Sequence, residues 1–477
     1  MKIAVIGSGI TGLGAAWSLE QGMAPVGAQV VLFEAESRLG GHSNTADITL
    51  KNPDGSLWHR AVDTGFIVFN SYNYPNLVNL FNHFDIPTTV TDMEFGVSVG
   101  RGGGSWQHKP KLEYRANNLF AQRRNLFNPG YIRMVLEILK FFKLGRLAQL
   151  EGIDDTITLG DFLRTHRFSE SFATEFLLPM AAAIWSGTSL SMRDYPVATF
   201  LRFYRNHGLL ALNESPIWRT VNGGSRVYVE RLAQELHADI RKNTAVGHVK
   251  SVENGQGVAV IDHSGNQDLF DHVIFACHSD QALAILGDEA SPLERELLGA
   301  IEYKPNRVVL HTDPSQLPNR RSAWSSWNYL AEDSSASSLQ TAISYYMNDL
   351  QVFESPEPIV VTVNPFAPID ERKIIQEFIY AHPQFNMRAI NAQRRIHEIQ
   401  GVSRRWFAGA WTGYGFHEDG LQSGLTVAAA LGGSVPWAGD IMPMSPASQC
   451  VNFGDVARRI RNEQNQYGDW QILNAAE

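Results

Sequence analysis

The N-terminal part of the chain alternates short apolar runs with glycine-bearing segments. Residues 2–6 are rich in Ile and Val, which predicts a short buried strand. The apolar residues Leu13, Ala16 and Leu19 then recur every three positions, which predicts a helix. A second apolar run over residues 30–33 predicts another strand. The chain therefore opens with a strand, a glycine loop, a helix and a second strand.

Each glycine of this loop has a physical reason to be there. Gly7 allows the tight turn after the strand, Gly9 lets the backbone approach a pyrophosphate, and Gly12 lets the helix and the strand pack closely. The helix N-terminus supplies amide donors and a partial positive charge for phosphates. Glu34, at the end of the second strand, can accept hydrogen bonds from a ribose and would repel a 2′-phosphate. We therefore expect a dinucleotide site that includes Gly7, Ser8, Gly9, Thr11, Gly12 and Glu34.

The wider pattern adds a long helix with two contrasting faces. Residues 131–150 carry a stripe of Arg and Lys, and apolar residues cover the rest of the predicted helix. This pattern is typical of a buried helix or of one that lies on an anionic membrane surface, and both interpretations stay open. A nearby group of basic residues, Lys109, Lys111, Arg115, Arg123 and Arg124, is compatible with a solvated face or with phospholipid contact.

Composition narrows the class of protein. The chain has 477 residues, more than one core usually holds, so we expect two domains. The net charge of −9 makes a nucleic-acid partner unlikely on electrostatic grounds, because such binding relies on clustered positive charge. Two distant cysteines, Cys277 and Cys450, favour neither a disulfide framework nor a zinc site, so we expect no metal and a cytoplasmic location. Peripheral contact at the inner face of the membrane is a further hypothesis.

The segment after the second strand brings in a family resemblance. Residues 34–42, with Arg38 before Gly40 and Gly41, resemble the extension of the dinucleotide motif in the flavin-containing amine oxidase superfamily, which includes protoporphyrinogen oxidases and carotenoid desaturases. The resemblance implies FAD, whose length needs this second set of close backbone contacts. It adds Ala35, Arg38, Gly40, Gly41 and His42 to the expected cofactor contacts. Amine oxidases typically have Arg where this chain has His42.

Further segments resemble the same superfamily in the same order. Residues 62–66 resemble the segment that passes by the flavin, residues 222–225 its later glycine turn, and residues 273–277 the closing strand of its FAD domain. The C-terminal block over residues 406–424 resembles its flavin-binding strand, loop and helix start, although Ala410 and Trp411 replace the usual acid. The cofactor contacts that this resemblance implies are Thr64, Gly65, Val246, Gly409, Asp419, Gly420 and Leu421.

The implied fold is α/β, with a Rossmann-type, amine oxidase-like FAD domain and an interleaved α+β substrate domain. We expect the FAD domain at 1–70, 220–300 and 400–435, the substrate domain at 71–219 and 301–399, and a C-terminal tail at 436–477. Cys450 lies past the flavin helix, so we expect FAD to be bound non-covalently.

Four short strings resemble a bacterial subfamily of predicted NAD/FAD-binding proteins whose relatives are associated with fatty-acyl lipid modification. They are residues 181–186, 206–210, 218–221 and 415–420. The resemblance implies an FAD-dependent dehydrogenase, desaturase or oxidase that takes a hydride from an apolar, lipid-like substrate. A flavin-dependent isomerase or mutase, an oxidase of a small amine, and a non-enzymatic FAD-binding protein are the alternatives.

Two groups of side chains are candidates for the substrate side of this chemistry. His417 and Tyr414 lie in the block expected beside the flavin, and either can polarise substrate or move a proton, although a structural role for His417 stays open. Aromatic residues on strand-like stretches are candidates for the wall of an apolar cavity or for a sheet core. They are Trp324, Trp327, Tyr329, Tyr345 and Tyr346.

Overall fold

The computed structural model describes residues 1–23, 27–100, 110–151, 154, 156–185, 191–206, 210, 216–252, 255–334 and 338–437. The chain folds into two compact units, each built from segments that alternate along the sequence. Unit 1 comprises Met1–Gly41, Val229–Ile301 and the chain from Arg388 onward, and unit 2 comprises His42–Tyr228 and Glu302–Met387. The expected domain boundaries stay a prediction; the two units group residues 42–70, 220–228, 301 and 388–399 differently from them. The expected tail lies almost wholly outside the described residues.

Unit 1 contains a five-stranded parallel sheet in the order β10-β2-β1-β14-β20. Its strands are β1 (Lys2–Ile6), β2 (Gln29–Phe33), β10 (Asp239–Arg241), β14 (His272–Phe275) and β20 (Arg405–Phe407). The apolar residues of β1, β2 and β14 are buried, as expected for a parallel sheet that is covered on both faces. A second, antiparallel sheet holds β11 (Val246–Ser251), β12 (Val258–Asp262) and β13 (Gln267–Phe270).

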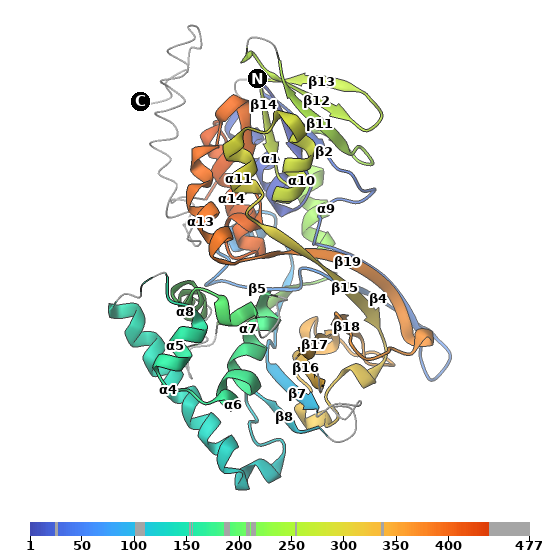
Figure 1. Cartoon of the computed structure of the whole chain (residues 1–477). Coiled ribbons are helices and arrows are strands. Elements are labelled where there is room, and N and C mark those ends of the chain that lie inside the picture. Colours follow the sequence, from blue (N-terminus) through green and yellow to red (C-terminus); the bar gives the residue numbers. More distant parts are fainter. Residues whose placement is uncertain are drawn as a thin grey trace. The chain divides into compact units, whose positions relative to one another are not determined.

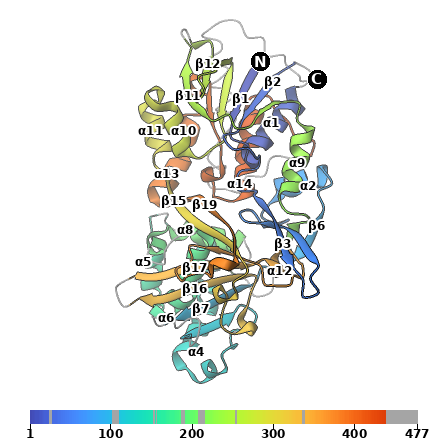
Figure 2. The same cartoon turned by 90° about the vertical axis from the view of Figure 1, so that its right-hand side faces the viewer.

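The helices of unit 1 are α1 (Ile10–Met23), α9 (Arg226–Glu235, which begins in unit 2), α10 (Ser279–Leu286), α11 (Pro292–Leu298), α13 (Met387–Arg395) and α14 (His417–Ala430). Helices α1 and α14 lie side by side (Figures 1 and 2). Small residues permit this close packing: a Cβ added at Gly424 would lie 2.3 Å from the carbonyl oxygen of Thr11. The predicted strand–loop–helix–strand order and the α/β fold class are therefore confirmed.

Unit 2 is built on a mixed sheet in the order β19-β15-β18-β17-β16-β7-β8. These strands are β7 (Phe95–Gly100), β8 (Leu112–Arg115), β15 (Glu302–His311), β16 (Trp327–Ser334), β17 (Ser338–Tyr346), β18 (Val360–Val363) and β19 (Ile374–Gln384). Smaller sheets pair β3 (Thr45–Lys51) with β4 (Leu57–Asp63), and β9 (Trp218–Val221) with β5 (Val68–Asn70) and β6 (Thr88–Thr91). Strands β15 and β19 run together as a long antiparallel ribbon (Figure 2).

Helices cover the rest of unit 2. They are α2 (Pro75–His83), α4 (Pro129–Glu151), α5 (Leu159–Thr165), α6 (Glu170–Phe172), α7 (Leu178–Trp185), α8 (Val197–Asn206) and α12 (Met347–Leu350), and the 3₁₀ helix η2 (Arg123–Phe127) precedes α4. A group of buried aromatic rings centred on Phe141 joins α4 to α5, α6 and α8. Within the described ranges, no helix is long and apolar enough to cross a membrane.

Candidate cofactor site

The glycine loop of unit 1 has the geometry that its sequence predicts. A Cβ added at Gly12 would lie 1.8 Å from the carbonyl oxygen of Gly7, so that position requires glycine to pack the helix against the strand end. A Cβ added at Gly9 would meet no atom within 4 Å, so the backbone there faces open space. Helix α1 begins at Ile10, and the first amides of a helix have no acceptor within it. The open backbone and the amide donors fit a pyrophosphate.

The second glycine segment lies directly against this loop. The amide of Gly40 donates to the carbonyl oxygen of Ser8 at 3.0 Å, and Gly9 and Gly40 form an isolated parallel bridge. A Cβ added at Gly41 would approach the α-carbon of Gly9 to 3.2 Å. The Arg38 guanidinium donates to the carbonyl oxygen of Gly41 at 2.7 Å. In this structure Arg38 therefore holds the glycine turn, while its predicted contact with the pyrophosphate stays a prediction.

The Glu34 carboxylate accepts hydrogen bonds from nearby residues but can still accept one from a ligand. Its carboxylate accepts hydrogen bonds from the amide and the hydroxyl of Ser8 and from the amide of Glu36. A carboxylate offers roughly four acceptor positions, so a ribose hydroxyl can still donate to it. The amide of Thr244 donates to the carbonyl oxygen of Glu34 at 2.8 Å. This bond brings the segment before the buried Val246 beside Glu34 and the exposed Ala35, while the predicted contacts of Val246 and Ala35 with the cofactor stay predictions.

The C-terminal block converges on the same loop. A Cβ added at Gly420 would lie 2.9 Å from Oγ1 of Thr11, and one added at Gly14 would lie 2.5 Å from Cδ1 of Leu421. The starts of α1 and α14 are therefore in direct contact within unit 1. Because each helix start carries free amides and a partial positive charge, the pair suits a long ligand with several anionic or electron-rich groups.

Asp419 serves the fold of this block rather than pointing to open space. Its carboxylate is 5% exposed and accepts hydrogen bonds from the backbone of Phe416, at 2.9 Å, and of Tyr414. Burial raises the pKa of Asp419 to about 7, while the two backbone hydrogen bonds oppose the rise. The acid thus shapes the loop that carries the two candidate catalytic residues. Tyr414 is buried in that loop, and His417 is half-buried at the first position of α14.

The positions that depart from the family pattern also have structural roles. The indole of Trp411 is buried and donates to the carbonyl oxygen of Cys277 at 3.1 Å, and the amide of Gly409 donates to the hydroxyl of Ser423 at 2.9 Å. Desolvation raises the pKa of the thiol of the partly exposed Cys277 to about 12, in line with an unreactive cysteine.

Gln393, on α13, lies outside every motif that the sequence carries. Its side-chain amide donates to the carbonyl oxygens of Trp411 and Gly413, each at 2.7 Å, and so supports the loop. No motif marked Gln393, because its partners are main-chain atoms far along the sequence.

Three predicted cofactor contacts, His42, Thr64 and Gly65, lie in unit 2. A Cβ added at Gly65 would lie 2.1 Å from the carbonyl oxygen of His42, so the two segments are in tight main-chain contact. The hydroxyl of Tyr380 bonds to Oγ1 of Thr64 and to Nδ2 of Asn44, each at 2.8 Å. These contacts build a buried polar cluster around the segment that resembles the one passing by the flavin.

Two histidines complete this cluster. The ring of His42 lies 5.1 Å from that of Tyr380 and 5.8 Å from that of His382, measured between centroids. Burial, and then the neighbouring His42, lower the pKa of His382 to about 4, so His382 is neutral at physiological pH. Tyr380 and His382 were not predicted. They stand two positions apart on β19, and side chains at that spacing on a strand point to the same face. This spacing is the one sequence signal that could have grouped them.

A buried acid in unit 2 joins two segments that the resemblance treated separately. Asp63 accepts from the amide of Ser225 at 2.8 Å and from the hydroxyls of Ser225 and Thr45 at 2.7 and 2.6 Å. The side-chain amide of Gln351 also donates to Asp63, at 3.1 Å. We call these four residues the Asp63 clasp. Burial raises the pKa of Asp63 to about 6, against the lowering effect of its hydrogen bonds.

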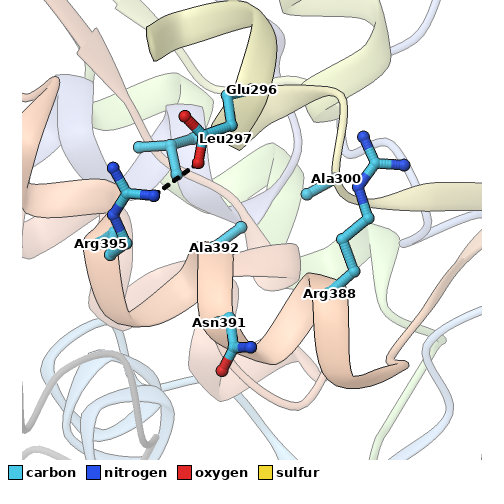
Figure 3. Close-up of a pocket in the computed structure, with 7 residues that line it drawn as sticks. All are labelled: Glu296, Leu297, Ala300, Arg388, Asn391, Ala392 and Arg395. Carbon is cyan, nitrogen blue, oxygen red and sulfur yellow. Dashed lines mark hydrogen bonds and ion pairs between the residues drawn. The ribbon is translucent and has the colours of Figure 1, made fainter.

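A surface pocket in unit 1 does not involve any of the predicted site residues. It has a volume of about 410 Å³ and lies between α11 and α13 (Figure 3). Its floor is apolar, and an ion pair between Arg395 and Glu296 closes one side. Its lining residues are Glu296, Leu297, Ala300, Arg388, Asn391, Ala392 and Arg395.

Comparison with solved structures finds the same fold in several enzymes. A fatty acid isomerase from P. acnes that produces CLA has a TM-score of 0.61 at 14% identity, over 90% of this chain and 97% of the isomerase. Cyclohexylamine oxidase from Brevibacterium oxydans has a TM-score of 0.62 at 14% identity, over 90% of this chain and 98% of the oxidase. Putrescine oxidase bound to putrescine has a TM-score of 0.61 at 14% identity, over 90% and 99% of the two chains. At such identities these similarities establish the fold alone.

Sequence comparison with known families decides membership. No curated protein matches the chain significantly. The model of the flavin containing amine oxidoreductases matches residues 10–337, which is more than half of the 477 residues. The chain therefore belongs to the flavin containing amine oxidoreductase family and is an FAD-dependent oxidoreductase.

Proposed function

We propose that this oxidoreductase removes a hydride from a C–H bond of an apolar, fatty-acyl or other lipid-like, substrate, with FAD bound non-covalently. FAD, when bound, supplies the hydride acceptor. The protein has to hold the cofactor, position the C–H bond and exclude water. The contact between the glycine loop, the second glycine segment and the start of α14 supports the first of these tasks in unit 1.

The observation that carries the lipid-like substrate is the aromatic surface of the unit 2 sheet. The rings of Trp327 on β16 and Tyr345 on β17 stack in parallel across the strands, with centroids 6.4 Å apart and planes 5° apart. A second pair, Trp324 and Tyr346, packs edge to face at 5.4 Å, but Tyr346 directly follows Tyr345 on β17 and so lies on the other face of the sheet. These four rings are only partly buried, while Tyr329 is fully buried and belongs to the sheet core. Uncharged, partly exposed rings favour an apolar ligand.

The residues proposed to move a proton are those that lie nearest the predicted cofactor contacts. In unit 1 these are Tyr414 and His417, on the loop that Asp419 shapes. In unit 2 His382 is neutral at physiological pH and lies beside His42, so its imidazole can orient a substrate through a hydrogen bond. We propose these side chains as the candidates for substrate polarisation, and the contacts described above are their support.

Anaerobic flavin spectroscopy tests the proposal. The purified protein should be yellow, and addition of linoleic acid without oxygen should bleach the flavin, whereas putrescine or cyclohexylamine should not. Bleaching by the amines alone would overturn the lipid assignment. A shifted double bond in recovered linoleic acid, with no lasting bleaching and no oxygen uptake, would replace hydride removal by isomerisation, the alternative that the P. acnes neighbour suggests.

A matched pair of variants separates the aromatic surface from the cofactor site. Trp327→Leu should weaken bleaching by the fatty acid but leave the flavin content unchanged, since Trp327 is not one of the predicted cofactor contacts. Gly9→Ala should lower the flavin content itself. If Trp327→Leu leaves the fatty-acid response untouched, the aromatic surface is not where the substrate binds.

A further inference from the structure

Helix α4 and the preceding η2 present an apolar and basic surface to solvent. Leu126 and Phe127, at the end of η2, are 50% and 88% exposed, and Leu136, Leu139 and Leu147 of α4 are 61%, 46% and 41% exposed. Exposed basic residues lie among them: Arg123, Arg133, Lys140, Lys143 and Arg146. We call these ten residues the α4 surface.

The seven residues of the α4 surface that belong to α4 share one face of the helix; Arg123, Leu126 and Phe127 belong to η2. Arg133, Leu136, Lys140, Lys143 and Leu147 follow one another at intervals of three or four positions, the spacing of a single helical stripe. Leu139 and Arg146 lie on the neighbouring row. With 23 residues the helix is about 34 Å long, so the stripe is an extended strip rather than a point of contact.

The opposite face of α4 is firmly held. Tyr131, Met134 and Phe141 are buried, and Phe141 packs against rings from three other helices. Glu137 accepts hydrogen bonds from the amide of Ser169, at 3.2 Å. The exposed leucines are therefore not the loose side of a poorly packed helix, because the same helix is well anchored through its other face.

Charge decides which partner this surface fits. Between residues 116 and 150 the chain has six Lys or Arg residues and a single acid, Glu137, whereas the whole chain has a net charge of −9. Glu137 is buried and paired with Arg133, so no exposed acid in this stretch opposes the cations. An apolar strip flanked by cations is the pattern that binds the interface of an anionic bilayer, where apolar side chains enter the acyl boundary and cations meet headgroup phosphates.

The wider basic cluster divides into two parts. Lys111 forms an ion pair with Glu175 at 2.6 Å, and Arg115 pairs with Glu94, so both are engaged within unit 2. Arg124 donates to the carbonyl oxygens of Pro110 and Lys111. Lys109 lies outside the described residues. Within the α4 surface, Arg133 pairs with Glu137 and Lys140 donates to the carbonyl oxygen of His166 at 2.6 Å, so the cations that carry the argument are Arg123, Lys143 and Arg146.

We propose that the α4 surface docks the protein peripherally on an anionic phospholipid bilayer. The inference deepens the proposed function, because fatty-acyl chains reside in membranes, but it stands on exposure and charge in unit 2 alone. Phe127 and the exposed leucines enter the interface, while Lys143, Arg146 and their neighbours meet the headgroups. Neither part alone gives firm binding; the two together do.

Vesicle sedimentation with the full-length, flavin-loaded protein tests this docking. Vesicles of phosphatidylcholine with 30% phosphatidylglycerol, roughly the anionic content at which polybasic segments bind well, should carry the protein down, and pure phosphatidylcholine should not. Raising the salt to about 0.5 M should release much of it, because the screening length falls well below 10 Å. Equal sedimentation with both vesicles, or none with either, would overturn the proposal.

Two double variants separate the apolar and the charged contributions. Lys143→Glu with Arg146→Glu should weaken binding at least about 25-fold, since each cation near the surface contributes roughly fivefold. Phe127→Ala with Leu136→Ala should weaken it at least about 10-fold. All four side chains are exposed, so unchanged circular dichroism and flavin absorbance should accompany the loss.

Matched controls carry the same chemical changes elsewhere. Lys51→Glu with Lys250→Glu alters the charge equally at exposed sites on β3 and β11, and Leu57→Ala with Leu269→Ala removes leucines that are 59% and 57% exposed. Both controls should bind like the unaltered protein. If the controls lose as much, or if the apolar pair has no effect while the charge pair abolishes binding, the surface is a general polyanion attractor and the membrane assignment is wrong. Neither result changes the outcome of the anaerobic flavin test, so the proposed function can hold even if the docking proposal fails.

Discussion

The glycine loop at residues 7–12 and the Asp63 clasp both lie in or beside segments in which cofactor contacts were expected. They are held together by different kinds of atoms. The loop is made of main chain: its key distances join backbone atoms, and glycine is needed because a Cβ would collide with a carbonyl. The clasp is made of side chains, with one buried carboxylate that satisfies donors from three separate segments. A site made of main chain is disrupted by almost any added side-chain atom. A site made of side chains is disrupted when one of its hydrogen-bond partners is removed.

The sharpest test of the main-chain site compares two glycines three positions apart. Gly12→Ala places a Cβ 1.8 Å from the Gly7 oxygen, which belongs to a strand end that cannot move away. We expect a loss of stability above about 4 kcal/mol, the range of exceptional substitutions, and little soluble protein. Gly9→Ala meets no atom and should leave the melting temperature of the flavin-free protein nearly unchanged while lowering FAD affinity.

Urea unfolding and flavin titration distinguish these outcomes. If Gly9→Ala binds FAD as tightly as the unaltered protein, the cofactor does not approach the backbone at this position. If Gly12→Ala is stable, the close packing of α1 on β1 is not what requires glycine.

The side-chain site should respond to loss of its acceptor. Asp63→Ala leaves the amide of Ser225 and the hydroxyl of Thr45 buried without their acceptor, and each unsatisfied donor costs about 1–3 kcal/mol. We expect a total loss of about 3 kcal/mol. Asp54→Ala, at an exposed turn of the same unit, is the control and should cost well under 1 kcal/mol. A similar small loss at Asp63 would show that the clasp contributes little.

The smallest effect concerns a buried acid that the main chain holds, Asp419. Its pKa is about 7 in the folded protein and near 3.8 when unfolded, so between these values the folded state binds more protons. Stability therefore falls as pH rises through this window. From pH 6 to pH 8 we expect the unaltered protein to lose on the order of 1 kcal/mol relative to Asp419→Asn.

Parallel urea titrations of both proteins at the two pH values measure this difference. A gap that does not change with pH would show that Asp419 titrates normally. The Asp63 carboxyl, with a pKa of about 6, contributes in the same direction at lower pH and is common to both proteins.

Local patterns were enough to predict the parts of the fold that depend on local physics. The apolar runs at residues 2–6 and 30–33 and the glycine spacing between them predicted β1, α1 and β2 almost to the residue. Residues 131–150 predicted α4, whose described residues are buried on one face and exposed on the other, while its contact with a membrane stays a proposal.

The side-chain partnerships were beyond reach for a physical reason. The pairing of Asp63 with Ser225, and of Thr64 with Tyr380, depends on how segments fold back in space, and neither residue type nor spacing encodes it. Likewise, Asp419 and Arg38 were assigned to the cofactor by resemblance, while the structure shows that each also secures its own loop. Their contact with FAD remains a proposal.

The clasp also has a consequence for the order of events during synthesis. Asp63 leaves the ribosome early, but Gln351 follows 288 positions later, and Ser225 comes between them. Contacts of such long sequence separation are slow to form, because the intervening loop must be closed before any of them is made. In a nascent chain that ends before Gln351, Asp63 still lacks one of its hydrogen-bond donors. Unit 2 should therefore reach its final form only after most of the polypeptide has emerged.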